Sequence, residues 1–224
     1  MYVEVSNMLF SRNLYMYGAF SLVQLLMFVT APVLPVSFGW ENGPIENAQV
    51  ILLIGGAVLA LRYRDAAPTK NQKIFWLIIA PLWFVMAVRE LSWGAVFYTP
   101  LSFDIELGPQ FSSSQQLWYK PAVAPVLASL ALALVCAFFY SKQYRTVIKL
   151  FKQSNLPITE LIIFAVLMIS AAAAEGHMGL HLGMDKGNSQ IYEEAVELLA
   201  YGALLFAQFR VMKGLAHTSS EKAI

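Results

Sequence analysis

Two histidines and two glutamates occur at helical spacing in the last third of the chain, where together they could hold a metal ion. His177 and His181 are four residues apart, and so are Glu193 and Glu197. Each pair therefore lies on one face of its segment if that segment is helical. Neutral imidazole and carboxylate are common donors to Zn, Fe and Mn. The pattern predicts a transition-metal site with Zn or Fe/Mn as its cofactor.

A site without metal fits the same residues. In that interpretation His181 lies at the lipid interface and His177 is hydrogen-bonded to a carboxylate. Two familiar metal-binding motifs are absent here. The His-Glu-x-x-His motif of zinc proteases would need glutamate at the position of Met178. The Glu-x-x-His motif of di-iron proteins, if it began at Glu175, would need histidine at that same position. Both interpretations therefore remain open at the level of sequence.

Two more glutamates are candidates for proton transfer beside this site. Glu194 is about 100° around the helix from Glu193, and Glu90 belongs to an apolar segment, where a carboxylate is costly unless it faces the bundle interior, water or a partner. We expect Glu90 and Glu194 to act as the general acid and base. The alternative is structural: Arg89 forms an ion pair with a glutamate, and this pair serves only to hold two helices together. The residues expected to support the site are Arg89, Trp93, Glu175 and Glu46.

The elements that would position these residues are transmembrane helices. Apolar residues make up 58% of the chain and charged residues 13%, with a mean hydropathy of +0.58, which leaves too little polar surface for a water-soluble globule. We expect an all-α, polytopic transmembrane bundle that forms one domain over residues 1–224. Its six helices should span about 14–38, 46–63, 74–98, 121–141, 158–181 and 190–210.

Charge is distributed unequally between the two ends of these helices. Twelve basic residues fall at alternate ends of successive helices, the pattern of cytoplasmic loops: Arg12, Arg62, Arg64, Lys70, Lys73, Lys142, Arg145, Lys149, Lys152, Arg210, Lys213 and Lys222. We call this the basic end, and expect both termini there, in the cytoplasm. The opposite, acidic end carries ten of the fourteen acids: Glu41, Glu46, Glu90, Asp104, Glu106, Glu175, Asp185, Glu193, Glu194 and Glu197. The polar pocket should face the periplasmic or extracellular side of a plasma (bacterial inner) membrane.

The chain between the helices brings the candidate residues together. A short turn over 182–190 makes the last two helices antiparallel neighbours. His181 should therefore lie at the same depth as Glu193, and His177 at the same depth as Glu197. Glu90 could complete the site from the third helix. The long segment 99–120 at the acidic end is either a lid over the pocket or a plain connection.

Three short motifs carry a resemblance. They are Glu41-Asn-Gly-Pro-Ile-Glu46, Arg89-Glu-Leu-Ser-Trp-Gly94 and Tyr192-Glu-Glu-Ala-Val-Glu197. The chain resembles an uncharacterised group of bacterial multi-spanning membrane proteins with ExGxxE, RE/EExSWG and YEExxE-type motifs. It is also remotely similar to ceramidase-like membrane hydrolases, which implies zinc held by His and acidic ligands within a helical bundle. This chain departs from those hydrolases because it has no Asp-x-x-x-His pair.

Three classes of function follow from these features. The first is a metal-dependent enzyme acting on a lipid-like substrate at the acidic end. The second is a structural or accessory subunit, with a protein partner or a second copy of the chain bound to it, and the third is a proton- or cation-coupled transporter. The bilayer is the expected partner in each case. No basic surface for nucleic acid and no phosphate-binding glycine loop is present in the sequence.

Overall fold

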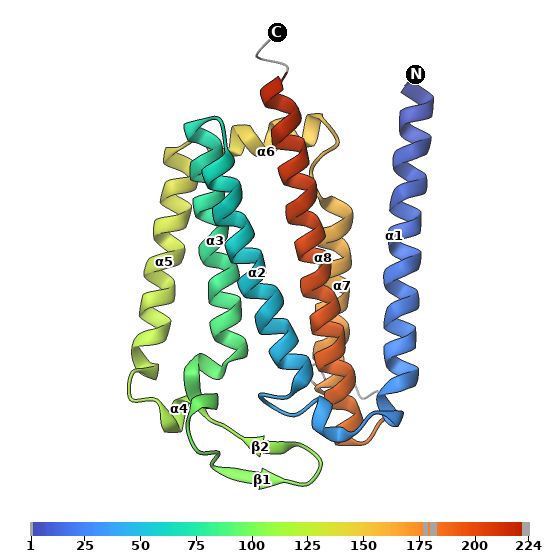
Figure 1. Ribbon diagram of the computed structural model, residues 1–224, viewed down its shortest axis with the longest axis vertical. Coiled ribbons are helices and arrows are strands. Elements are labelled where there is room, and N and C mark those ends of the chain that lie inside the picture. Colours follow the sequence, from blue (N-terminus) through green and yellow to red (C-terminus); the bar gives the residue numbers. More distant parts are fainter. Residues whose placement is uncertain (1, 177–178, 180–182, 221–224) are drawn as a thin grey trace.

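In the part of the chain that the computed structural model describes, six long helices run side by side (Figure 1). The structure describes residues 2–176, 179 and 183–220, with side chains for 13–176, 179 and 183–216. The expected histidines His177 and His181 lie outside the described residues. The six helices are α1 (Tyr2–Thr30), α2 (Pro44–Ala66), α3 (Lys70–Glu90), α5 (Lys120–Tyr140), α7 (Ile158–Ala174) and α8 (Lys186–Ser220).

The length and composition of these helices make this an integral, multi-pass membrane protein. Within the described residues, five helical stretches are long and apolar enough to cross a bilayer: 13–33, 44–66, 70–90, 120–140 and 186–216. The helix α7 is apolar but has 17 residues, or about 26 Å at about 1.5 Å per residue, slightly less than the roughly 30 Å of hydrocarbon. The expected all-α transmembrane bundle is confirmed.

The packed core lies among α2, α3, α7 and α8. Leu53 of α2, Trp83 of α3 and Tyr201 of α8 form one buried cluster, and Leu167 of α7 joins a second cluster with Val196 of α8. In contrast α5, which is described throughout, has no buried side chain and lies at the edge of the bundle beside α3 (Figure 1). The site must therefore be held by the four packed helices.

Several helices differ in length from the expected ones. The helix expected over 74–98 ends at Glu90, because Trp93 and Gly94 have left-handed backbone angles (φ 59° and 100°) inside the 3₁₀ segment η3 (Ser92–Phe97). The first helix ends at Thr30, and two 3₁₀ turns follow, η1 (Ala31–Val33) and η2 (Val36–Phe38). The last helix is longer at both ends than the expected 190–210. The expected 158–181 is helical to Ala174, and part of its remainder is outside the described residues.

Short elements that were not expected occur at both ends of the bundle. At the acidic end the strands β1 (Ser102–Asp104) and β2 (Gly108–Gln110) form an antiparallel hairpin, followed by the short helix α4 (Ser113–Gln116). At the basic end α6 (Gln143–Lys152) lies across the bundle (Figure 1). The helix α6 is strongly amphipathic, with Gln143, Thr146 and Leu150 buried and Arg145 and Lys152 exposed, which suits the membrane interface.

Candidate functional site

A cavity of about 590 Å³ lies at the acidic end of the bundle. Five glutamates line it, together with apolar residues and one basic residue: Glu41, Glu46, Leu107, Gln110, Ala174, Glu175, Gly176, Met184, Lys186, Ser189, Gln190, Glu193 and Glu194. We call it the acidic cavity. Of the site residues expected from the sequence, four line this cavity: Glu46, Glu175, Glu193 and Glu194.

The start of α2 positions Glu46. Gly43 precedes the helix in an extended conformation and Pro44 occupies its first turn, which suits the fixed φ of proline. The Glu46 carboxylate accepts a hydrogen bond from the backbone N–H of Asn42, so that it turns back over the start of its own helix. The loop before α2 approaches α8 closely, since a Cβ on Gly39 would lie 2.7 Å from the Ile191 nitrogen.

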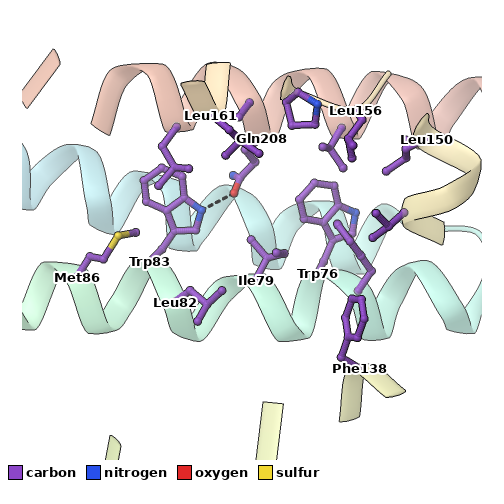
Figure 2. Close-up of a pocket in the computed structure, with 16 residues that line it drawn as sticks. Trp76, Ile79, Leu82, Trp83, Met86, Phe138, Leu150, Leu156, Leu161 and Gln208 are labelled. Carbon is purple, nitrogen blue, oxygen red and sulfur yellow. Dashed lines mark hydrogen bonds between the residues drawn. The ribbon is translucent and has the colours of Figure 1, made fainter. Parts of the chain in front are cut away.

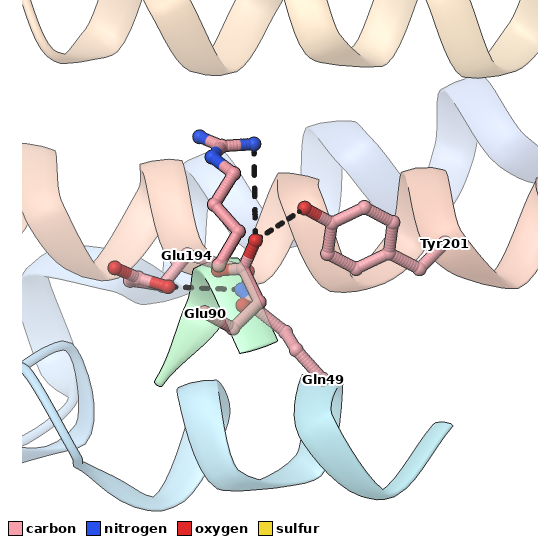
Figure 3. A network of polar contacts seen from close by, with 5 residues as sticks. Gln49, Glu90, Glu194 and Tyr201 are labelled. Carbon is pink, nitrogen blue, oxygen red and sulfur yellow. Dashed lines mark hydrogen bonds and ion pairs between the residues drawn. The ribbon is translucent and has the colours of Figure 1, made fainter. Parts of the chain in front are cut away.

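A glutamine on α2 holds Glu194. Gln49 is fully buried, and its Nε2 donates to Glu194 Oε2 at 2.9 Å and to the Glu194 carbonyl at 2.8 Å (Figure 3). The other amide atom, Gln49 Oε1, has no hydrogen-bond partner among the described residues. The Glu194 carboxylate is thus fixed beside an oxygen that still has acceptor capacity.

Glu90 lies in a neighbouring constellation that does not line the acidic cavity. Its Oε1 accepts a hydrogen bond of 2.7 Å from the hydroxyl of Tyr201 and lies 3.8 Å from Arg89 Nη1 (Figure 3). Glu90 is buried, whereas the Arg89 side chain is 57% exposed. Glu197 is not a cavity-lining residue either, but interacts electrostatically with Glu90, Arg89 and Glu175. The carboxylates therefore form two adjoining groups.

Trp93 is placed differently from the expected supporting role. Its carbonyl accepts a hydrogen bond of 2.7 Å from Tyr119, and Lys120 Nζ lies 5.0 Å from the centre of its ring. The left-handed turn at Trp93 directs the chain toward the hairpin and the start of α5. Trp93 thus connects the ends of α3 and α5 and is not among the residues that line the acidic cavity.

The segment 99–120 does reach the acidic cavity. Leu107 and Gln110 line it, and the backbone N–H of Phe111 donates to Glu41 Oε2 at 3.1 Å. Glu41 Oε1 accepts a second hydrogen bond of 2.5 Å from Ser92. Of the two alternatives for this segment, a covering structure fits these contacts better than a plain connection.

The expected metal site is only partly described. Among the described residues, no three His, Cys, Asp or Glu side chains are close enough to hold a metal ion together. Glu193 lines the cavity, but His177 and His181 lie outside the described residues, so the set of four ligands stays a prediction. Gly176, directly before these histidines, and Met184, the second described residue after them, both line the cavity.

A second polar arrangement, missed from sequence, continues from Glu90 toward the basic end. Trp83 Nε1 donates to Gln208 Oε1 at 2.5 Å, and Gln208 Nε2 donates to the Gly56 carbonyl at 3.0 Å. We define the polar seam as the following residues of α2, α3 and α8, spaced seven apart on each helix: Gln49 and Gly56; Trp83 and Glu90; Glu194, Tyr201 and Gln208. Residues seven apart lie on nearly the same face of an α-helix, so this spacing was the sequence signal from which the polar seam could have been predicted.

Comparison of the chain with protein-family models, with curated proteins and with solved structures yields no match. Its function is therefore inferred from the geometry of the site.

Proposed function

We propose that this protein binds a metal cation in the acidic cavity and acts as a metal-dependent membrane enzyme on a lipid-like substrate. The observation that carries this proposal is the convergence of Glu46 from α2 with Glu193 and Glu194 from α8 on one cavity. Carboxylates on facing helices of a bundle are a common way to hold a catalytic metal.

The balance of charge around the cavity supports a cationic ligand. Five glutamates line it, and of the described residues that line it Lys186 is the basic one. Charges near low-dielectric surroundings require compensation by a partner of opposite sign. Arg89 lies nearest to Glu90 in the adjoining group, and the described residues that line the cavity carry more carboxyl groups than basic groups.

The remaining ligands and the acid or base follow from the sequence pattern. In this proposal His177 and His181 join Glu193 around Zn, Fe or Mn in the acidic cavity, and Glu197 reaches the ion from the adjoining group. Glu194, oriented by Gln49, accepts a proton from the attacking water. Apolar Leu107, Ala174 and Met184 in the same cavity suit a substrate with both polar and apolar parts.

The metal content of detergent-purified protein tests this proposal. The comparison includes wild type, Glu193→Gln/Glu194→Gln, His177→Ala and the control Glu106→Gln, which changes an exposed acid outside the cavity. We expect near-stoichiometric Zn, Fe or Mn in wild type and control, and its loss in the other two variants with helicity retained. A metal-free wild type that stays metal-free after incubation with each ion would overturn the proposal.

A proton- or cation-coupled transporter is the second candidate, and the polar seam favours it. The hydrogen bonds of Gln208 with Trp83 and Gly56 place polar groups about eleven residues along α8 from Glu197, or roughly 16 Å deeper. Ion flux in proteoliposomes, with Glu90→Gln as the variant and Glu106→Gln as the control, tests this candidate. Flux equal to that of empty liposomes would exclude it.

A further inference from the structure

A second cavity, of about 320 Å³, lies along α3 between Met86 and the residues of α6, and it is almost entirely apolar. It is lined from four long helices and α6 by these residues: Phe75, Trp76, Ile79, Leu82, Trp83, Met86, Phe138, Val147, Leu150, Leu156, Pro157, Leu161, Leu204, Ala207, Gln208 and Val211. We call it the apolar cavity. Figure 2 shows its side chains spread along α3, from Met86 to Trp76.

The shape and chemistry of the apolar cavity suit a hydrocarbon chain. Met86 and Trp76 are ten residues apart on α3, so the cavity extends about 15 Å along the helix axis. Among the described residues that line it, the polar side-chain groups are the indole N–H groups of Trp76 and Trp83 and the amide of Gln208, and both atoms of this amide have partners, Trp83 and the Gly56 carbonyl. The lining is therefore better suited to an apolar than to a polar ligand.

The basic end of the apolar cavity is covered by α6, which provides charge complementary to an anionic group. Val147 and Leu150 of α6 line the cavity, while Arg145, Lys149 and Lys152 belong to the same helix, which carries no acid. Arg210 is the nearby cation on α8, and it is already paired with Glu160. A basic amphipathic helix at a membrane interface attracts anionic lipid headgroups.

We propose that the apolar cavity and α6 together form a binding site for an anionic phospholipid. One acyl chain lies along α3 in the cavity, and the phosphate lies beside Arg145 and Lys149. This site shares no lining residue with the acidic cavity and does not depend on the function proposed for it.

Quenching of tryptophan fluorescence by brominated lipid tests this proposal, because Trp76 and Trp83 both line the apolar cavity. Wild-type protein is placed in phosphatidylcholine nanodiscs that contain a small fraction of phosphatidylglycerol or phosphatidylcholine brominated in the middle of the acyl chain. We expect brominated phosphatidylglycerol to quench at a several-fold lower mole fraction than brominated phosphatidylcholine.

Paired variants locate the source of this preference. Arg145→Gln/Lys149→Gln should remove it, whereas Arg62→Gln/Lys213→Gln, which takes the same charges from the basic end outside α6, should keep it. Equal quenching by the two lipids in wild type, or a preference that survives the α6 variant, would overturn the proposal. Absence of quenching by either lipid would also overturn it, and would indicate that a second copy of the chain covers the cavity.

Discussion

The indole nitrogen of Trp83 and the side-chain oxygen of Gln208 are 2.5 Å apart in the interior of the bundle, and both side chains are almost completely buried. Gln208 also donates to the Gly56 carbonyl, so one amide joins α2, α3 and α8. The apolar face of this junction lines the apolar cavity, and its polar groups continue the row that begins at Glu194 and Glu90. The junction therefore connects the wall of the apolar cavity to the polar seam.

A double-mutant cycle on Trp83 and Gln208 should show positive coupling. Trp83→Phe leaves the Gln208 oxygen without its donor, and Gln208→Leu leaves the Trp83 N–H without its acceptor, whereas the double variant contains neither of these two groups. The bond to the Gly56 carbonyl is lost in both variants that lack Gln208, so this loss cancels in the cycle. We expect a coupling of about 0.6 kcal/mol, and at most about 1.7 kcal/mol, since hydrogen bonds between membrane helices fall in this range. Unfolding in SDS of the four proteins measures it, and strictly additive losses would contradict the hydrogen bond.

Gly56→Ala should destabilise the protein, whereas Gly55→Ala should not. A Cβ on Gly56 would lie 2.5 Å from Cδ2 of the Trp83 indole, but a Cβ on Gly55 meets nothing within 4 Å. Overpacking a core costs about 1–3 kcal/mol, while alanine in a helix gains about 0.5–1 kcal/mol over glycine. Thermal unfolding in detergent compares the two variants directly, and equal transition temperatures would contradict this packing.

Tyr201→Phe should cost stability because it removes the hydroxyl that donates to buried Glu90. Leaving a buried acceptor without its donor costs about 1–3 kcal/mol. Glu90→Gln keeps an acceptor oxygen for Tyr201 and should cost less. The free energy of unfolding of both variants checks this order, and a Tyr201→Phe protein as stable as wild type would show that the contact is not formed.

The ion pair of Arg210 with Glu160 should be far more important for stability than the pair of Arg64 with Asp65. Arg210 Nη1 lies 2.9 Å from Glu160 Oε2, and the two side chains are 13% and 5% exposed. Arg210→Met leaves a buried carboxylate and should cost about 3–5 kcal/mol. Arg64→Gln breaks an exposed pair of 3.8 Å and should cost about 0–1 kcal/mol.

A further variant separates charge from packing in the buried pair. Arg210→Met/Glu160→Met removes both charges and should regain much of the stability that Arg210→Met loses. Unfolding of the three variants under identical conditions measures this recovery. A double variant that is less stable than Arg210→Met would show that the loss comes from packing.

The hairpin at the acidic end should loosen in acid. Asp104 Oδ1 accepts hydrogen bonds from the backbone N–H groups of Glu106 and Leu107, and these bonds hold the pKa of Asp104 below its ordinary value of 3.8. The stabilisation from this group is present above pH 3.8 and is lost as the pH falls through the lower pKa of the folded protein.

Trp40 provides the signal for this change, because its ring packs on Phe103 and its Nε1 donates to the Glu106 carbonyl. The difference in fluorescence between wild type and Trp40→Phe should therefore change in this acid range. Asp104→Asn keeps an acceptor oxygen that does not titrate, and its signal should stay constant. An identical acid transition in Asp104→Asn would assign it to another group.

The sequence by itself determined that this protein crosses a membrane as a helical bundle and that its acids gather at one end, because hydropathy and charge are properties of composition and order. The sequence also placed Glu46, Glu193 and Glu194 at the same end of the bundle, where all three line the acidic cavity. The four-residue spacing of Glu193 and Glu197 predicted that both face one site, but of these two glutamates Glu193 lines the acidic cavity and Glu197 does not.

The tertiary structure alone decided which helix faces meet. Helical periodicity states that Glu194, Tyr201 and Gln208 share a face, but not that Gln49, Glu90 and Trp83 lie opposite them. The sequence of this segment also did not predict that α3 ends at Glu90. The left-handed backbone at Trp93 accompanies contacts of Trp93 with Tyr119 and Lys120, which lie more than twenty residues further along the chain. Hydrogen-bond partners far apart in sequence are chosen by packing, which the pattern of any single segment does not contain.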